Sequence, residues 1–534
     1  MTTFTVSIRF SCLVTLWVFT MVFSGFAHAQ AGRVSIGTVP PVQLEAPIEM
    51  PSWFSNGTPG NDAWIALGAL EQAASHGLNP ADYQAEALAT AFQTVRNGAG
   101  AEQLSRLDER LTTAVVRYLS DLNVGRLDPQ ELQHRFQKPL SGAFDARSYL
   151  AEVRQADRLD EALQKPRENI PMYEALRSMM NEYRAMGDHP AWLATLPPLQ
   201  SRSLKPGAEW SGLPIVAARL GAMGDLPRGI PTSTLYDGAL VEAVRRFQER
   251  HGLETDGVLG RATLVELNVT PAQRVKQMAL TLERLRWTPL LRGPRMIVVN
   301  IPEFMLRAYE VVDGKVEIEL EMRVVVGRAL DTRTPIFLED MRSIEFSPYW
   351  NVPLSIARGE TLPRLRRDPG YFSREGFEIV TRDGRVVNEL TDDAIAAVQR
   401  GEWRIRQRPG PRNSLGDIKF IFPNDQNIYL HHTPSTGLFP RARRDFSHGC
   451  IRVEMPLELA RFALKLQPEW TPKRIEDAMS AGRSRTVALR EPIPVLLAYS
   501  TVVIKNSGKV YFFPDIYQQD GKLEQALRTL RPSN

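Results

Sequence analysis

The sequence is poor in cysteine. Among its 534 residues there are only two, Cys12 and Cys450, and Cys12 lies in an N-terminal apolar segment that we expect to be removed. The remaining chain would carry one thiol and no internal disulfide, although an exported protein is free to form disulfides. A lone thiol in an oxidising compartment is at risk of oxidation. It is therefore either buried and inert or kept for its reactivity, and the cysteine count leaves both interpretations open.

The chain also lacks a strong excess of charge of either sign. Lys and Arg number 65 and Asp and Glu 61, which gives a net charge of +4. A nucleic-acid binder normally carries a concentrated basic face, so we expect no nucleic-acid partner. The composition is 43% hydrophobic and 24% charged, as in ordinary folded proteins. Because one hydrophobic core does not extend over 534 residues, we expect several domains.

Long apolar runs are missing too, and the longest begins near the N-terminus. Arg9 is the only charged residue of segment 1–29, an apolar run follows from Phe10 to Phe23, and Ala27-His28-Ala29 precedes Gln30. A positive start, an apolar middle and an A-x-A end are typical of a secretory signal peptide. The run is shorter than the roughly 20 residues that a membrane span needs. We expect cleavage before Gln30, export to the periplasm or cell envelope and no stable membrane span afterwards; the alternative is an uncleaved anchor.

Two segments that differ in composition and in apolar spacing follow the signal. Residues 30–60 contain five prolines and predict an extended linker without a core. From about 61 to 200 the apolar spacing is helical: Leu111, Val115 and Leu119 recur every fourth residue and share one helix face. We expect a helical domain over this range.

Residues 201–270 predict a small three-helix unit. Leu240, Val244 and Phe247 lie at i, i+4 and i+7 of one helix, and a turn at Asp256-Gly257 precedes another. The string FQERHGLETDGVLGRATLVELN resembles the peptidoglycan-binding module of wall hydrolases, the three-helix "binding domain 1". The same positions also suit an ordinary core and its turns, so the resemblance specifies the fold more closely than the ligand.

After residue 293 the pattern changes to strands. Short runs rich in valine, isoleucine and aromatics alternate with turns: MIVVNI, FMLRAYEVV and VEIELEMRVVVG, the last two joined by a hairpin signal at Asp313-Gly314. A mixed stretch over 353–411, with a helix near 391–400, interrupts this pattern and predicts a lid-like insertion over the site. We expect a mainly β domain over 293–485, a C-terminal segment over 486–534, and an α+β multidomain protein as a whole.

The chemistry is concentrated in the string IYLHHTPSTGLFPRARRDFSHGCIRVEMP, residues 428–456. Thiol catalysis needs a thiolate, and a nearby imidazole forms it by taking the proton. His431 ends a strand-like run, and the loop after it can return Cys450 to within hydrogen-bond reach. His448 stands two residues before the cysteine, where on a strand it would share its face and on a tight turn it would support the loop.

Two plainer interpretations of this string remain. Cys450 can be a buried structural cysteine. A metal site from His431, His432 and His448 is the other, but with one cysteine and no helical His-x-x-x-His spacing we expect no metal.

The same string resembles the active-site motif of the L,D-transpeptidases, the YkuD-type domain. Ser447-His448-Gly449-Cys450-Ile451-Arg452 fits the family pattern [Ser/Thr]-His-Gly-Cys-x-Arg, with a histidine at the end of a strand upstream. The resemblance implies that Cys450 is the nucleophile and His431 the general acid and base. It implies an oxyanion hole of backbone N–H groups near Gly449 and Cys450. Substrate binding or loop support is implied for five residues, Ser447, His448, Gly449, Arg452 and Tyr429.

Other strings extend the resemblance to the large YcbB-like branch of these enzymes. SPYWNVPLSIA, LGDIKFIFPN, FFPDIY and HGLNPADY are similar to that branch, which has a helical scaffold, an inserted peptidoglycan-binding module and a lid-like insertion. In that branch an acidic residue usually follows the catalytic histidine, whereas this chain has His432 there. The group that orients the His431 imidazole is therefore open. We expect a solvated loop for three arginines, with attraction of wall carboxylates as the alternative: Arg441, Arg443 and Arg444.

The resemblance implies a cofactor-free exchange on peptidoglycan stem peptides, in cell-wall biogenesis and the maintenance of cell shape. A thioester on Cys450 would pass a donor stem to the side-chain amine of a second stem and form a 3→3 crosslink. Carbapenem β-lactams would be inhibitors, because in this family they mimic the donor carbonyl. Two alternatives remain open: an L,D-carboxypeptidase, in which water replaces the amine, and a non-catalytic protein that only binds peptidoglycan.

Overall fold

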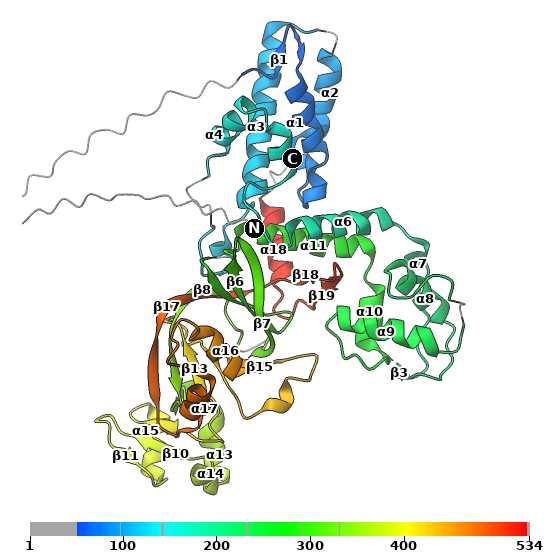
Figure 1. The fold of residues 1–534 in the computed structure, drawn as a ribbon. Coiled ribbons are helices and arrows are strands. Elements are labelled where there is room, and N and C mark those ends of the chain that lie inside the picture. Colours follow the sequence, from blue (N-terminus) through cyan, green and yellow to red (C-terminus); the bar gives the residue numbers. More distant parts are fainter. Residues whose placement is uncertain are drawn as a thin grey trace, which may run out of the picture. The chain divides into compact units, whose positions relative to one another are not determined.

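The computed structural model describes residues 51–96, 98–139, 144–230, 233–290, 292–329 and 332–530. The expected signal peptide and its cleavage site lie outside the described residues. Within these ranges no helix has the length and apolar character that a membrane crossing requires. Figure 1 shows the elements in sequence colours.

The N-terminal part is helical, as expected. A two-stranded hairpin, β1 (Phe54–Ser55) and β2 (Thr58–Pro59), precedes the first helix, and the Trp53 indole donates to Thr112 Oγ1 over 2.8 Å. Leu111, Val115 and Leu119 of α3 are fully buried in one core, which confirms the helical spacing. The main helices of this part are α1 (Asn61–Glu71), α2 (Ala85–Val95), α3 (Ala101–Val124), α4 (Ala146–Gln155), α5 (Leu159–Gln164) and α6 (Tyr173–Met186).

Helix α11 (Pro271–Trp287) extends this core from much later in the chain. Met278, Leu282 and Leu285 of α11 belong to the same cluster of buried side chains as α3. A capping box at Thr270 begins the helix, since its side chain accepts from Gln273 N and the Gln273 side chain accepts in return. The helical part is therefore assembled from two separated stretches of sequence.

The three-helix unit lies between these stretches. It contains α8 (Leu213–Ala222), α9 (Gly238–Arg250) and α10 (Arg261–Asn268), with a short pair of strands, β3 (Ser203–Leu204) and β4 (Leu259–Gly260). These helices share a core of their own. The turn before α10 requires Gly257, because its φ is +73° and an added Cβ would lie 3.1 Å from side-chain atoms of α9. The expected helices and turn are confirmed.

A nine-stranded sheet forms the largest β structure of the chain. Its order is β15-β7-β16-β14-β13-β8-β17-β5-β6. Because β7 also pairs with β6, the strands from β7 to β6 form a closed ring of pairings. The Asp313-Gly314 hairpin is confirmed, since Val312 pairs with Lys315 and both central residues have positive φ. The strands are β5 (Arg295–Asn300), β6 (Met305–Val312), β7 (Lys315–Gly327), β8 (Phe337–Phe346), β13 (Ile418–Ile421), β14 (Leu430–His431), β15 (Asp445–Ser447), β16 (Ile451–Val453) and β17 (Arg485–Ala498).

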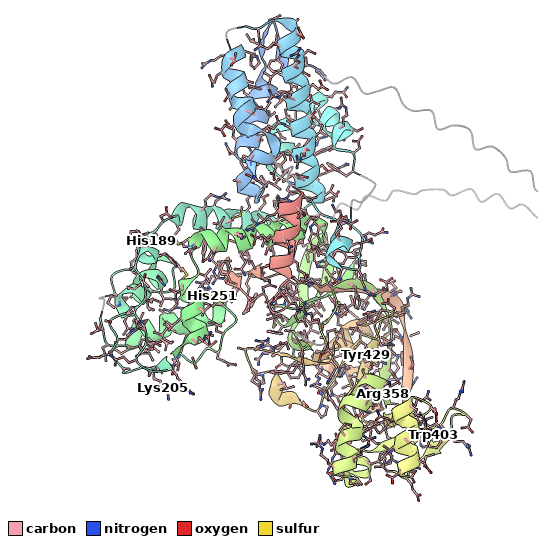
Figure 2. The ribbon with its side chains drawn as sticks, turned by 180° about the vertical axis from the view of Figure 1, so that it is seen from behind. His189, Lys205, His251, Arg358, Trp403 and Tyr429 are labelled. Atoms are coloured by element: carbon pink, nitrogen blue, oxygen red, sulfur yellow. The ribbon has the colours of Figure 1, made fainter. Side chains whose placement is uncertain are left out.

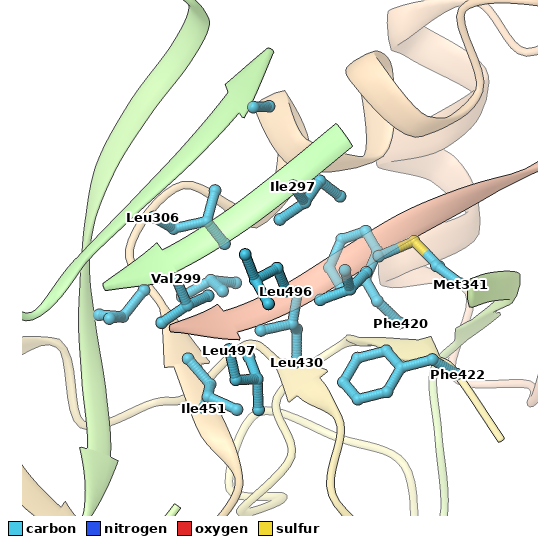
Figure 3. Close-up of a cluster of buried hydrophobic side chains, with 14 of the residues drawn as sticks. Ile297, Val299, Leu306, Met341, Phe420, Phe422, Leu430, Ile451, Leu496 and Leu497 are labelled. Carbon is cyan, nitrogen blue, oxygen red and sulfur yellow. The ribbon is translucent and has the colours of Figure 1, made fainter. Parts of the chain in front are cut away.

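Alternation along these strands separates an apolar face from a polar one. In β13, Ile418 and Phe420 are fully buried while Lys419 between them is partly exposed. Figure 3 shows the buried side, where Phe420, Leu430 and Ile451 gather with residues of β5 and β17. Helices α16 (Pro456–Ala463) and α17 (Pro472–Ser480) add Leu459 and Ile475 to this core. The site therefore has a rigid apolar layer beneath it.

Residues 350–407 form a separate subdomain within this part of the chain. A four-stranded sheet in the order β11-β10-β12-β9 has its own buried cluster, which includes Leu362, Ile379 and Ile405. The helix expected near 391–400 is confirmed as α15. Figure 2 labels Arg358 and Trp403 in this subdomain. Its elements are β9 (Trp350–Asn351), α12 (Leu354–Ile356), the π-helix η4 (Ala357–Thr361), α13 (Leu362–Arg367), α14 (Gly370–Arg374), β10 (Phe377–Val380), β11 (Val386–Val387), α15 (Asp392–Arg400) and β12 (Arg404–Gln407).

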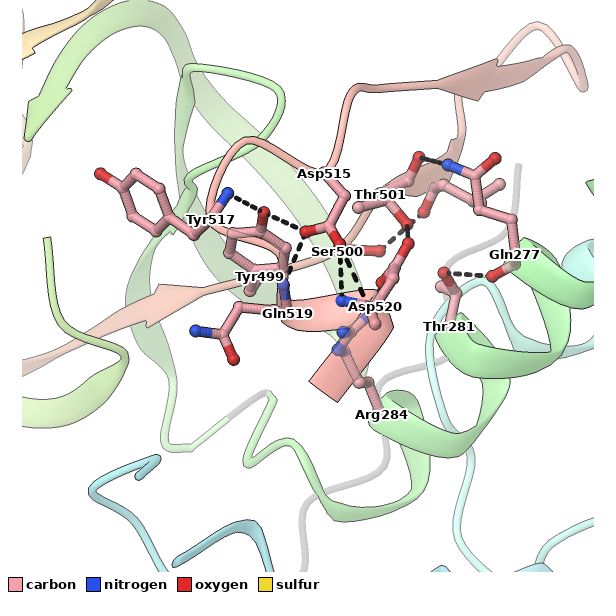
Figure 4. A network of polar contacts seen from close by, with 12 residues as sticks. Gln277, Thr281, Arg284, Tyr499, Ser500, Thr501, Asp515, Tyr517, Gln519 and Asp520 are labelled. Carbon is pink, nitrogen blue, oxygen red and sulfur yellow. Dashed lines mark hydrogen bonds and ion pairs between the residues drawn. The ribbon is translucent and has the colours of Figure 1, made fainter. Parts of the chain in front are cut away.

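The C-terminal segment is tied to both the sheet and α11. Strand β17 begins at Arg485 and pairs with β8 and β5, so the sheet continues into this segment. Beyond it lie β18 (Val502–Ile504), β19 (Val510–Phe512) and α18 (Gln519–Thr529). In Figure 4 the Asp515 carboxylate accepts from the Tyr499 hydroxyl over 2.6 Å and from N–H groups at the start of α18, while Arg284 of α11 pairs with Asp520.

Candidate active site

One row of side chains crosses the polar face of the large sheet. The strand register pairs Glu345 of β8 with Lys419 of β13, Lys419 with His431 of β14, and His431 with Arg452 of β16. Residues directly opposite each other in a sheet project to the same face. The adjacent row points the other way into the core and is fully buried: Ile344, Phe420, Leu430 and Ile451.

Cys450 stands at the edge of this row, immediately before β16. The N–H of Ile451 donates to the carbonyl oxygen of Tyr429 over 3.0 Å, which places Cys450 beside Tyr429 on the neighbouring strand. The Cys450 Sγ lies 3.5 Å from the carbonyl oxygen of Asn427. The rings of Tyr429 and His431 are 6.2 Å apart, edge to face. The fold thus brings the two residues expected to be catalytic, with Tyr429, to one face of the sheet.

The imidazole of His431 is held by the backbone. Its Nδ1 lies 2.5 Å from the carbonyl oxygen of His432, so a protonated Nδ1 donates there and Nε2 keeps its lone pair. Burial, together with the charges of Arg452 and Lys419, lowers the pKa of His431 to about 3. The ring is therefore neutral at pH 7, as a general base must be before it accepts a proton.

The side chain of His432 contacts an acidic residue on the neighbouring segment. Its Nδ1 lies 2.8 Å from Asp417 Oδ1, and its backbone N–H donates to Ile418 on β13 over 3.0 Å. Gly416 lies under the ring, since an added Cβ there would lie 2.7 Å from His432 atoms. An acidic residue is thus present beside the motif, but it contacts His432 and not His431.

The Cys450 thiol is protonated in the resting site. Burial raises its pKa above the usual 9.0, although hydrogen bonding to Tyr429 and the charges of Lys419 and Arg452 oppose the rise. A thiol beside a neutral imidazole becomes a nucleophile when the proton moves as the sulfur attacks. The pair can therefore carry out acyl transfer without a standing thiolate.

The turn between β15 and β16 is closed by Ser447. Its Oγ donates to the carbonyl oxygen of Cys450 over 2.5 Å and accepts from the Gly449 N–H over 3.1 Å. Gly449 has a φ of +113°, and Thr334 Oγ1 donates to its carbonyl oxygen over 2.7 Å. The Gly449 N–H is therefore already occupied, which differs from the expected oxyanion hole. Within the described ranges the Cys450 N–H has no such acceptor, and it remains the donor that this turn offers.

His448 lies in the turn and not on a strand, so the second of its two expected geometries is correct. Its Nε2 is 2.7 Å from Glu360 Oε1 of the π-helix η4. Short π-helical turns are frequent at functional sites. The inserted subdomain thus contacts the turn that carries Cys450, two residues before that cysteine.

Within the residues that the structure describes, Arg452 forms no ion pair and brings its cation to the site. Its guanidinium is half-buried, and the buried Nε has no hydrogen-bond partner among the residues that the structure describes. Burial lowers its pKa, which the charge of Cys450 opposes. A guanidinium without a carboxylate partner can bind a carboxylate of a ligand in two parallel hydrogen bonds.

The expectation of a solvated arginine loop is wrong for Arg444. This side chain is buried and donates to the carbonyl oxygens of Val324 and Phe304, so it holds the loop to β7. Arg443 pairs with Asp445 over 2.6 Å, and Arg441 is exposed. Sequence periodicity cannot predict which of these arginines is buried, because their burial depends on strands more than 100 residues away.

Sequence reasoning missed Lys419, Asp417 and Glu360. The alternation of Ile418, Lys419 and Phe420 places Lys419 on the polar face, and that signal was present in the sequence. Asp417 and Glu360 carry no comparable local signal. Across the described part of the chain no group of three or more His, Cys, Asp or Glu side chains is arranged to hold a metal ion.

Comparison with protein families gives three matches along the chain. Residues 294–487 match the family described as "L,D-transpeptidase catalytic domain" (YkuD). Residues 49–180 match a family described as "Scaffold domain", and residues 216–267 match one described as "Putative peptidoglycan binding domain". The first of these ranges contains the row of side chains and Cys450.

A curated relative from Haemophilus influenzae, described as "Putative L,D-transpeptidase", is 34% identical over 264 residues. This match covers 49% of the chain and 51% of the relative, so the chain spans about half the length of that protein. The crystal structure of an L,D-transpeptidase (residues 123–326) from Xylanimonas cellulosilytica is similar at 16% identity and a TM-score of 0.17, covering 57% of this chain and 100% of that one.

A second solved structure is a fused Zn-dependent amidase/peptidase with a peptidoglycan-binding domain from Clostridium acetobutylicum. It is similar at 19% identity and a TM-score of 0.12, and the similarity covers 27% of this chain and 70% of that one. At these TM-scores neither solved structure defines the fold of the whole chain.

Proposed function

We propose, from the premise that this chain contains a YkuD-type L,D-transpeptidase catalytic domain and a peptidoglycan-binding domain, that it forms 3→3 crosslinks in peptidoglycan through a thioester on Cys450. The observation that carries the proposal is the placement of Cys450 beside β14, on the face where a neutral His431 keeps a free Nε2. Together they form a nucleophile and a base on a rigid sheet, with no cofactor required.

In the first step the Cys450 sulfur attacks the carbonyl carbon of the third residue of a tetrapeptide stem. The thiol proton passes to His431 Nε2, and the Cys450 N–H donates to the oxygen that becomes negative. The imidazolium then gives this proton to the nitrogen of the terminal D-alanine. A C–S bond has formed, the C–N bond has broken, and D-alanine leaves as a neutral amine.

In the second step the side-chain amine of another stem attacks the thioester. His431 takes a proton from this amine and returns it to the sulfur as the C–S bond breaks. A new C–N bond links the third residues of two stems, and the thiol is restored. When water attacks instead, the product is a tripeptide, which is the L,D-carboxypeptidase alternative.

The surrounding residues support this exchange. Arg452 binds a carboxylate of the donor stem, because it is the unpaired cation beside Cys450. Ser447 and Gly449 hold the turn, and His448 joins it to the inserted subdomain. A carbapenem acylates Cys450 at the same carbonyl position. The module at 216–267 keeps the enzyme near its polymeric substrate and raises the local concentration of stems.

The place of action is the cell envelope, which is where peptidoglycan lies. We propose that residues 1–29 act as a cleaved signal peptide and that the mature chain works in the periplasm, in cell-wall biogenesis and the maintenance of cell shape.

Mass analysis of muropeptides tests the proposal. The purified chain from Gln30 to Asn534 is incubated with tetrapeptide muropeptides, beside the Cys450→Ser variant. A dimer with loss of one D-alanine, absent with the variant, supports crosslinking. Tripeptide without dimer establishes the carboxypeptidase alternative, and an unchanged mixture with intact sedimentation on sacculi leaves only the binding protein.

A further inference from the structure

Lys419 has no part in the proposed exchange, yet it lies in the middle of the catalytic face. It is the cross-strand partner of both His431 and Glu345, and its side chain is 19% exposed. An ammonium group that is mostly removed from water needs a compensating partner. Glu345 is a weak one, because its Oε2 lies 3.9 Å from the Lys419 Nζ and its Oε1 accepts from Ser484.

The ammonium group of Lys419 lies over the face of the Tyr429 ring. The Nζ stands 3.9 Å from the ring centroid, a close cation–π contact in a partly dry setting. Burial lowers the pKa of Lys419, while the charges of Glu345 and Cys450 oppose this. Figure 2 labels Tyr429, which lies one residue before β14.

Tyr429 is in turn the neighbour of Cys450 across the two adjacent strands. The backbone bond from Ile451 to Tyr429 aligns Tyr429 with Cys450 on adjacent strands. Burial raises the pKa of Tyr429, and the charge of the neighbouring Cys450 raises it further. The phenol therefore stays protonated and can donate to the sulfur.

A cation over the ring strengthens this donor. It withdraws electron density from the phenol, so the O–H becomes more positive and favours a charged acceptor. Hydrogen bonds to an ionised acceptor are about twice as strong as neutral ones. Because His431 is neutral at rest, its imidazolium forms only as the thiol proton is transferred, and before that the positive charges that lower the pKa of Cys450 are those of Lys419 and Arg452.

We propose that Lys419 is a positioning residue that acts through Tyr429 to stabilise the Cys450 thiolate as it forms. Lys419 Nζ lies over the Tyr429 ring, and the strand register places Tyr429 beside Cys450, so a hydrogen bond from the Tyr429 hydroxyl to the sulfur is the link that this inference requires. Lys419 and Arg452 also repel the imidazolium of His431, which favours return of the proton to the leaving amine. The inference rests on the proposed role of Cys450 as nucleophile.

The test is the pH dependence of Cys450 alkylation by iodoacetamide in the mature chain, whose only thiol is Cys450. Lys419→Met removes the charge and keeps the length of the side chain. The midpoint of the curve of alkylation rate against pH should rise by about one pH unit, as expected for a lost cation near a thiolate. The rate at pH 7.5 should fall about threefold and not tenfold, because a thiolate of higher pKa is intrinsically more nucleophilic. Lys419→Arg should restore most of the change.

Tyr429→Phe separates action through the ring from direct action. It should raise the midpoint, and the double variant with Lys419→Met should raise it little further, because the two residues act as one unit. The matched control is Lys505→Met, since Lys505 lies over the ring of Tyr511 at 4.3 Å in the β18–β19 hairpin. It should leave the midpoint unchanged.

An unchanged midpoint in Lys419→Met, or additive shifts in the double variant, would overturn the inference. If Lys419→Met does not fold, as shown by thermal unfolding, the Tyr429→Phe and Lys419→Arg midpoints decide the matter. Alkylation does not depend on crosslinking. A shifted midpoint in a chain that yields no dimer therefore contradicts the proposed function alone, and a normal dimer yield with an unshifted midpoint contradicts this inference alone.

Discussion

The Nδ1 atom of His431 lies 2.5 Å from the carbonyl oxygen of His432, the next residue in the chain. A backbone acceptor therefore orients the imidazole, and it does so whatever side chain follows. This accounts for the departure from the family pattern at position 432. The imidazole of His432 pairs instead with Asp417, which holds the start of β13 next to the end of β14.

His432→Ala should therefore keep most of the activity. The carbonyl remains, and only the contact with Asp417 and the packing on Gly416 are lost. We expect acylation by a carbapenem to slow less than about tenfold, against about 10³-fold for His431→Ala, which removes the base. Stopped-flow acylation rates of both variants make the comparison. Equal losses would mean that the His432 side chain orients the ring.

Cys450→Ser should fold normally and lose crosslinking. A hydroxyl is a far weaker nucleophile than a thiol beside the same neutral imidazole. In the mature wild-type chain N-ethylmaleimide should add once and abolish dimer formation, and the variant should take up none. Intact-mass spectrometry and a muropeptide digest report both quantities. A Cys450→Ser enzyme that still forms dimers refutes the thioester mechanism.

His448→Ala should cost less than His431→Ala, because His448 supports the turn and does not move the proton. Its loss removes one 2.7 Å contact with Glu360. Glu360→Gln should therefore slow acylation to a similar extent, and the double variant should add little, since both changes break the same contact. If His448→Ala is the more severe of the two histidine variants, the base has been assigned to the wrong residue.

His251→Phe should make the fold more resistant to acid. Burial lowers the pKa of His251 well below 6.5, and its ring stacks between Phe247 and Phe512. The neutral form is favoured in the folded state, so this stability is present above pH 6.5 and lost as the pH falls. The loss is up to about 1.4 kcal/mol per pH unit. Unfolding free energies of variant and wild type should converge or cross between pH 6.5 and 4.5, whereas parallel curves would mean that His251 does not take part.

Protein taken from the native envelope should begin at Gln30. The segment before it has the polarity and the A-x-A end that signal peptidase recognises. Terminal sequencing by mass spectrometry distinguishes the outcomes. An intact segment 1–29 would show that it stays as an anchor.

The sequence by itself determined which residues are candidates for catalysis, and it predicted most of the element types. The Ser-His-Gly-Cys string and the upstream His431 identified the nucleophile and base as candidates, because motif residues lie close together along the chain. Local periodicity predicted the strands around the Asp313-Gly314 hairpin and the helix α15, since both patterns depend on neighbouring side chains.

The tertiary structure alone decided what surrounds that pair. Glu345, Lys419, His431 and Arg452 come from four strands and meet only through the sheet register. The contact of His448 with Glu360 and the burial of Arg444 likewise join residues about 90 or more positions apart. Register depends on hydrogen bonds between distant segments and on which face the core buries, and neither is encoded in a local pattern. The candidate base, His431, was therefore recognisable in the sequence, while the cations that keep its pKa low were identified only from the pairing of the strands.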